Sequence, residues 1–180
     1  MIIPFLAVAA ALGLVVVLST RWRRQSSQKM VDLPKKPWLL LVALALQFVW
    51  THWLSHLGPS AEKLTWILPL SYVPVMCFVA FNWRFSWSRV IAVGVAMNFA
   101  VMIANGGTMP APAQFSSHPP PTGEERIAPG SKDRIVAHST VLAPFQDQFV
   151  VTLPGGSQHL ASLGDFVSLS GAVVGLLSTL

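Results

Sequence analysis

The sequence predicts an all-α, polytopic helical membrane protein with about five transmembrane helices and one long extracytoplasmic loop. Of its 180 residues, 53% are hydrophobic and only 11% are charged, whereas about 25% are charged in a typical soluble domain. Five mostly apolar stretches contain no Asp, Glu, Lys or Arg: 1–20, 37–61, 64–83, 90–104 and 166–180. Too little charge remains to coat a water-facing surface, so a lipid-facing exterior is expected.

A single membrane domain over residues 1–180 accounts for this pattern. Its helices are expected at about 2–20, 38–57, 64–82, 90–105 and 165–180, with the loop over 106–164. Asp165 is expected to be the N-cap of the last helix. The fifteen residues from Phe166 give only about 22 Å of helix against a hydrocarbon core of roughly 30 Å. This helix therefore either begins near Leu160 or has its end sunk against its neighbours.

The positions of the basic residues predict the orientation. Arg21, Arg23 and Arg24 follow the first apolar run, whereas a secretory signal peptide carries its basic residues before that run. An uncleaved anchor with its N-terminus outside places eight of the twelve basic residues in the inner segments 19–37 and 82–89. The tryptophans divide between the two interfaces in agreement with it: Trp22, Trp38, Trp83 and Trp87 inside, Trp50, Trp53 and Trp66 outside. We expect a multi-pass protein of the bacterial plasma membrane with a cytoplasmic C-terminus.

The long loop has two parts of different composition. Its first half is rich in proline, which opposes regular structure. Its second half contains short β-branched runs at 135–142 and 149–153, which are expected to form strands or extended segments over the mouth of the bundle. Residues 145–165 are expected to pack over the turn at Asn105–Pro110.

The fourth helix contains a ridge of small residues and two asparagines. Ala92, Ala96 and Ala100 recur every four residues, which allows another helix to approach closely. Asn98 and Asn105 lie two turns apart on one face, and an asparagine in a membrane needs a polar partner inside the protein.

The end of that helix permits two interpretations. Gly106 is suited to the left-handed conformation that ends a helix, and Gly107 lets the chain turn before Met109-Pro110. The segment is either a helix stop with interhelical hydrogen bonds, or its backbone groups and Asn105 line a ligand site. On the last helix, Gly171 and Gly175 form a GxxxG pair expected to pack on the fourth helix, with a partner subunit as the alternative.

Two histidines are the candidate cofactor ligands. His52 and His56 lie four residues apart on the expected second helix, so they share one face. Such a pair can bind one metal, or each histidine can ligate a haem or a chlorophyll-type pigment. No spacing supplies a third metal ligand, and both positions suit a water-satisfied histidine at the interface. No metal site and no cofactor is predicted on this basis.

Several function classes are disfavoured. No carboxylate lies deep in an apolar segment and no hydrolase, zinc-protease or phosphate-loop motif occurs, so no catalytic residue is assigned and the chain is not expected to be an enzyme. The basic residues flank membrane segments, which indicates orientation and contact with lipid head groups rather than nucleic acid. Cys77 is the lone cysteine, which excludes a disulfide framework.

Three motifs together resemble a known family. They are Asn98 with Asn105-Gly106-Gly107-x-Met109-Pro110 after a membrane helix, Ala143-Pro144-Phe145-Gln146-Asp147 in the loop, and Leu163-Gly164-Asp165 opening the last helix. In them the chain is similar to a bacterial family of small polytopic membrane proteins of unknown function. It departs from the pattern at Ala111, where valine is common, and at Gln146, where glycine is usual. The resemblance implies a membrane architecture and no established activity.

Three functions are therefore expected in order. The first is a non-catalytic accessory, scaffold or assembly subunit that contacts membrane lipids and partner subunits. The second is a haem-, pigment- or metal-binding membrane protein that uses His52 or His56. The third is a small-solute carrier with its site near Asn98 and Asn105, beside the proline-interrupted third helix.

Overall fold

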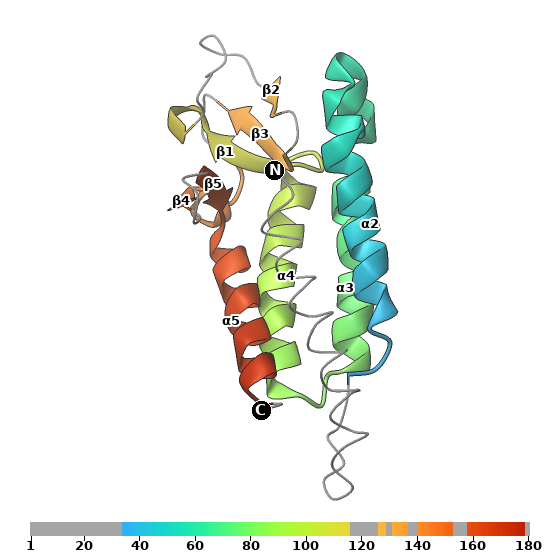
Figure 1. Ribbon diagram of the computed structural model, residues 1–180. Helices are drawn as coiled ribbons and strands as arrows, with labels where there is room; N and C mark the ends of the chain where they lie inside the picture. Colours follow the sequence, from blue (N-terminus) through green and yellow to red (C-terminus); the bar gives the residue numbers. More distant parts are fainter. Residues whose placement is uncertain (1–33, 116–125, 129–130, 137–139, 153–157, 179–180) are drawn as a thin grey trace, which may run out of the picture.

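The chain is mostly helical, with two small sheets at one end of the helices (Figure 1). A computed structural model describes residues 34–115, 126–128, 131–136, 140–152 and 158–178. The α-helices in this part are α2 (Trp38–His52), α3 (Ile67–Phe81), α4 (Ser86–Ala104) and α5 (Leu163–Leu177). Short 3₁₀ turns, η1 (Leu54–His56) and η2 (Gly58–Leu64), connect α2 to α3.

The helices lie side by side in an antiparallel series. α2 packs on α3, α3 on α4, and α4 most extensively on α5 (Figure 1). Within the described residues, three helical stretches are long and apolar enough to cross a membrane: Trp38–His56, Ser60–Phe81 and Ser86–Ala104. The series is held by one apolar cluster near the sheets, which includes Trp50, Leu68 and Met102, and by another at the far end around Phe78 and Trp87.

The connection from α4 into the sheets is a glycine turn. Gly106 has φ +71° and Gly107 has φ +90°, and the Gly107 N–H donates to the Met102 carbonyl at 2.8 Å, five residues back. This is the hydrogen bond of a Schellman helix end. A Cβ at Gly107 would also lie 3.0 Å from the Thr65 carbonyl carbon. The left-handed conformation expected of Gly106 is confirmed.

The region beyond this turn forms a cap over one end of the helices. We define the cap as the sheet of β1 (Met109–Pro112), β3 (Asp133–Val136) and β2 (Arg126–Ile127), together with the hairpin of β4 (Phe149–Thr152) and β5 (Gln158–Ala161). β3 is central, parallel to β1 and antiparallel to β2. β4 and β5 are antiparallel, and β5 leads into α5. The Asp147 N–H donates to the Pro110 carbonyl at 3.1 Å, so the later loop packs on the turn after α4.

These elements correct several boundaries. The chain is not all-α, because residues 109–161 contribute five short strands to the described part. Three candidate spans are found among the described residues. The expected helix 2–20 lies outside these residues and α5 is a shorter apolar helix of 15 residues, so the count of five stays a prediction. α4 begins at Ser86 rather than near residue 90, and α2 ends at His52 rather than at residue 57.

The N-cap of α5 is Ser162 rather than Asp165. The Asp165 N–H donates to Ser162 Oγ at 3.0 Å, and the Ser162 N–H donates to Asp165 Oδ2 at 3.0 Å. This reciprocal pair is a capping box, in which the acidic residue stands three positions after the cap.

Candidate functional site

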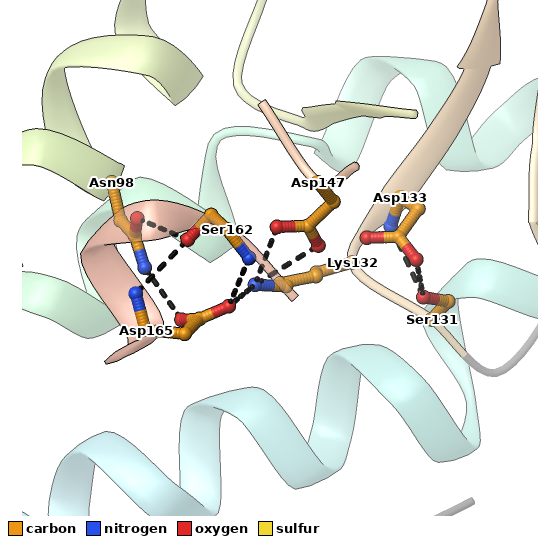
Figure 2. A network of polar contacts seen from close by, with 7 residues as sticks. All are labelled: Asn98, Ser131, Lys132, Asp133, Asp147, Ser162 and Asp165. Atoms are coloured by element: carbon orange, nitrogen blue, oxygen red, sulfur yellow. Dashed lines mark hydrogen bonds and ion pairs between the residues drawn. The ribbon is translucent and has the colours of Figure 1, made fainter. Parts of the chain in front are cut away.

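A cluster of buried ionic groups joins the cap to α4 and α5. Lys132, directly before β3, places its Nζ 3.0 Å from Asp165 Oδ2 and 3.2 Å from Asp147 Oδ2 (Figure 2). The side chains of Lys132, Asp147 and Asp165 are 13%, 0% and 30% exposed. Because these residues come from three separate segments, one ammonium group cross-links the central strand, the loop after η4 (Ala143–Phe145) and the start of α5.

Asn98 extends the cluster into α4. Its Nδ2 donates to Asp165 Oδ1 at 2.6 Å, while its Oδ1 accepts from Ser162 Oγ at 2.7 Å (Figure 2). Both carboxylate oxygens of Asp165 therefore have partners, since Oδ2 is bound by Lys132 and by the Ser162 N–H. The buried amide makes the hydrogen bonds that an apolar environment demands.

Glycines allow α5 to approach α4 closely enough for these bonds. A Cβ on Gly164 would collide with Asn98 Oδ1 and would lie 2.7 Å from the Gly94 carbonyl oxygen. A Cβ on Gly94 would collide with Ser168 and with the Gly164 carbonyl oxygen. The Gly164-Asp165 motif thus combines close packing with a carboxylate placed at the helix start.

Asp133 lies on the other side of Asp147. Its Oδ2 accepts from Ser131 Oγ at 2.7 Å, and the Ser131 carbonyl accepts from Trp50 Nε1 of α2 at 2.8 Å. Asp133 Oδ1 and Asp147 Oδ2 are both buried without a hydrogen-bond partner. Asp147 Oδ2 does have an ion pair, since Lys132 Nζ lies 3.2 Å from it and 3.4 Å from Asp147 Oδ1. Asp133 Oδ1 has neither a hydrogen bond nor an ion pair among the described residues.

Burial and neighbouring charges shift the pKa values of Lys132 and Asp147. Burial lowers the pKa of the Lys132 ammonium group, but Asp147 and Asp165 raise it more, leaving a pKa well above the ordinary lysine value. Burial raises the pKa of the Asp147 carboxyl well above its ordinary value; Lys132 opposes this shift, and Asp133 adds to it by charge repulsion and hydrogen bonding. Lys132 therefore holds its proton more tightly than an ordinary lysine, and Asp147 more tightly than an ordinary aspartic acid.

The structure brings together some of the candidate site residues that the sequence analysis named. Asn98, Asp147, Gly164 and Asp165 meet at the cluster, and Pro110 contacts it through the Asp147 backbone. Buried Met109 lies beside Pro110 in β1 and belongs to the apolar cluster.

Asn105 is placed apart from this cluster. Its Nδ2 donates to the carbonyls of Val101 and Val141, and its Oδ1 accepts from the Val141 N–H. It therefore fixes the α4 end to the loop. This arrangement fits the interpretation as a helix stop with internal hydrogen bonds.

The expected helix-packing residues behave differently from one another. Gly171 and Gly175 face α4, with ideal Cβ positions 2.8 Å from Ile91 N and 3.1 Å from the Trp87 ring. Ala96 and Ala100, by contrast, are exposed, and Ala92 is half-buried. The alanine ridge therefore does not form the α4–α5 contact, and its use by another helix stays a prediction.

His52 and His56 do not share a helix. α2 ends at His52, whose ring stacks on Phe48 with centroids 4.8 Å apart, and His56 belongs to η1. Both are exposed, and no group of three His, Cys, Asp or Glu residues among the described residues is arranged to hold a metal. Binding of haem or pigment there stays a prediction.

Sequence reasoning missed Lys132, Asp133 and Ser162. Ser162 was detectable, because a serine three residues before an acidic residue at the start of an apolar run is the signature of a capping box. Lys132 and Asp133 lie in a loop far from the other members in sequence, and no local pattern connects them. The small number of charges was the available hint, since three of only seven acidic residues of the chain occur here.

The fold and the cluster define a class: a mostly helical protein whose described part has three helices long and apolar enough to cross a membrane, and a cap attached by buried ionic contacts. The chain belongs to the family of unknown function DUF5317, whose profile matches residues 33–177. Comparison with curated proteins and with solved structures finds no match.

Proposed function

We propose that this protein is a multi-pass integral membrane protein with a structural role, an accessory, scaffold or assembly subunit of a membrane complex. The observation that supports it is the separation of the buried charged residues from the exposed apolar ones. The buried charges are directed at one another and attach the cap to the helices, whereas the outer faces of the helices carry large apolar side chains. The exposed apolar residues include Trp38, Leu41, Val42 and Phe48 on α2, Leu70, Val73 and Phe81 on α3, Val93 and Ile103 on α4, and Leu169, Val173, Val174 and Leu177 on α5.

These apolar faces suit lipid or the helices of another membrane protein. Exposure of such apolar surfaces to water is unfavourable in free energy, and soluble monomers rarely expose large continuous apolar patches. Within a bilayer, helices associate through van der Waals packing and close approach, for which exposed Ala96 and Ala100 of α4 leave room.

Catalysis and solute transport receive less support from the same cluster. Asn98, Ser162 and Asp165 use their polar atoms on one another and on Lys132. Groups saturated by internal hydrogen bonds are poor candidates for binding a solute, because the solute would have to replace every bond that it broke.

We further propose that the cap lies outside the cell and the opposite end of the helices lies in the cytoplasm. The start of α2 and the connection from α3 to α4 lie at the end opposite the cap (Figure 1). Lys35 and Lys36 lie just before α2, Arg84 lies between α3 and α4, and Arg89 is in the first turn of α4. This distribution matches the excess of basic residues found in cytoplasmic segments. Exposed Trp38 and Trp83 lie at the basic end, and exposed Trp53 and Trp66 at the cap end, as expected for interfacial belts.

Labelling of two matched serine positions tests this orientation. Exposed Ser60 of η2 lies at the cap end and exposed Ser86 at the start of α4. In a Cys77→Ala background, which removes the exposed native thiol, a membrane-impermeant maleimide is expected to label Ser60→Cys in intact cells. Ser86→Cys should react only after permeabilisation. Labelling of Ser86→Cys alone in intact cells would reverse the orientation.

Isolation from the native membrane tests the structural role. After extraction in a mild detergent, the protein is expected to elute larger than a detergent-bound monomer and to carry a partner membrane protein in fixed proportion. The same sample in a strongly dissociating detergent provides the control, in which the partner should be lost. A monomer without a partner under mild extraction would contradict the proposal.

A further inference from the structure

Two buried carboxyl groups face each other, and each has one oxygen without a hydrogen bond. Asp133 is 7% exposed and Asp147 is fully buried. Figure 2 shows the two carboxyl groups pointing toward one another from β3 and from the loop after η4. The atoms left without a hydrogen bond are Asp133 Oδ1 and Asp147 Oδ2, one on each group.

Two ionised carboxylates cannot satisfy each other. An ionised carboxylate only accepts hydrogen bonds, so two of them offer four oxygens and no donor. A buried acceptor without a hydrogen bond destabilises the fold, and like charges in a poorly solvated site add repulsion. One proton on either group changes the balance, because it supplies a donor for the other group and removes one negative charge.

We propose that Asp133 and Asp147 form a proton-binding site, in which one proton taken from water on the cap side is shared between Asp133 Oδ1 and Asp147 Oδ2. A single hydrogen then gives both oxygens the hydrogen bond that each lacks, while Asp147 Oδ2 keeps its ion pair with Lys132. The site holds the sheet of β1, β2 and β3 against the segment that carries Asp147. It is distinct from the contact of Lys132 with Asp165, which holds the cap to α5.

The groups that surround the pair are consistent with one bound proton. Lys132 faces Asp147 from the start of β3, Asp165 approaches from α5, and Tyr72 of α3 and Asn98 of α4 border the Lys132–Asp165 side. Three carboxylates and one ammonium group give a net charge of −2 without the proton and −1 with it. The pKa of Asp147, which burial raises well above its ordinary value, agrees in direction with this geometry.

The sign of the pH dependence follows from that direction. A group whose pKa is higher in the folded than in the unfolded chain stabilises the fold below its unfolded pKa, and this contribution is lost as pH rises through the folded pKa. Stability of the cap is therefore expected to fall as the pH rises and the shared proton leaves. Lys132, whose pKa is raised as well, loses its charge only at more alkaline pH than an ordinary lysine.

Infrared spectroscopy of the wild-type protein in lipid tests the site directly. We expect a protonated-carboxyl stretching band at neutral pH that disappears on alkalinisation. Carbon-13 labelling of aspartate should shift the band to lower frequency, which assigns it to an aspartic acid side chain rather than to a glutamic acid. The chain has only seven acidic residues in all. A wild-type spectrum without such a band at neutral pH would overturn the proposal without any variant having to fold.

Two substitutions and a matched control give a second readout. Asp147→Asn and Asp133→Asn each supply an amide donor in place of the shared proton, so either should abolish the band and flatten the pH dependence of Tm. Glu62→Gln removes a 56% exposed carboxylate on the same side of the molecule and should leave both readouts unchanged. Persistence of the band and of the pH slope in either folded Asn variant would overturn the assignment.

Discussion

Replacement of Lys132 by methionine is expected to lower the free energy of unfolding by about 3–5 kcal/mol, the usual cost of removing one partner from a buried ion pair. Methionine keeps much of the length of the side chain but leaves Asp165 and the Asp133–Asp147 pair without their cation. Lys132 Nζ lies within 3.2 Å of an oxygen of both Asp147 and Asp165. Chemical unfolding in detergent micelles, followed by circular dichroism, provides the measurement.

Two companion variants sharpen this expectation. Lys63→Met removes an exposed lysine of η2 and should change stability by less than about 0.5 kcal/mol. Lys132→Met combined with Asp165→Asn should recover part of the loss, because the uncompensated carboxylate of Asp165 is removed with its partner. Equal stability of the Lys132 and Lys63 variants would show that the ion pairs do not hold the cap.

Substitution of Gly171 by leucine is expected to lower the free energy of unfolding by about 1–3 kcal/mol or more, because the added side chain overpacks the α4–α5 contact. An ideal Cβ at this position would lie 2.8 Å from Ile91 N and 2.9 Å from the Trp87 carbonyl oxygen. Both are backbone atoms of α4, so rotation of a side chain does not relieve the contact and α5 has to move outward. Thermal unfolding compared with wild type in the same detergent measures the effect.

Neighbouring positions provide the controls for Gly171. Ser170→Leu changes an exposed residue of the same helix and should cost little. A Cβ at Gly175 would lie 3.1 Å from the Trp87 ring, and a side-chain ring can shift more easily than backbone. The loss of stability in Gly175→Ala should therefore lie between the losses in the Gly171 and Ser170 variants. If the Gly171 and Ser170 variants were equally stable, the tight α4–α5 contact would be wrong.

Local signals in the sequence accounted for the helices and their ends. Unbroken apolar runs identified α2, α3 and α4 as stretches able to cross a membrane. The left-handed Gly106 was foreseeable because glycine adopts positive φ without steric cost. The packing of Gly171 and Gly175 on α4 followed from the GxxxG spacing, although their partners on α4, Trp87 and Ile91, were not foreseeable.

The helix ends and the pairing of the strands were harder to predict from the sequence. η2 continues the apolar stretch of α3 at its beginning, whereas α2 ends at His52 and separates it from His56. Tertiary contacts and local turn geometry decide such ends more than propensity does. The strands were expected only as short runs over the bundle mouth; their pairing depends on which segments the glycine turn after α4 brings together.

The order of apolar and charged residues along the chain is sufficient to predict the helices, the glycine turn and the basic end. The meeting of Lys132, Asp133, Asp147, Asp165 and Asn98 in one buried site is seen only in the folded chain. Hydrophobic periodicity is a local property that each segment displays alone, whereas an ion pair forms between groups separated by 15 or 33 residues. Their meeting depends on how the cap folds back onto the helices, which no single segment encodes.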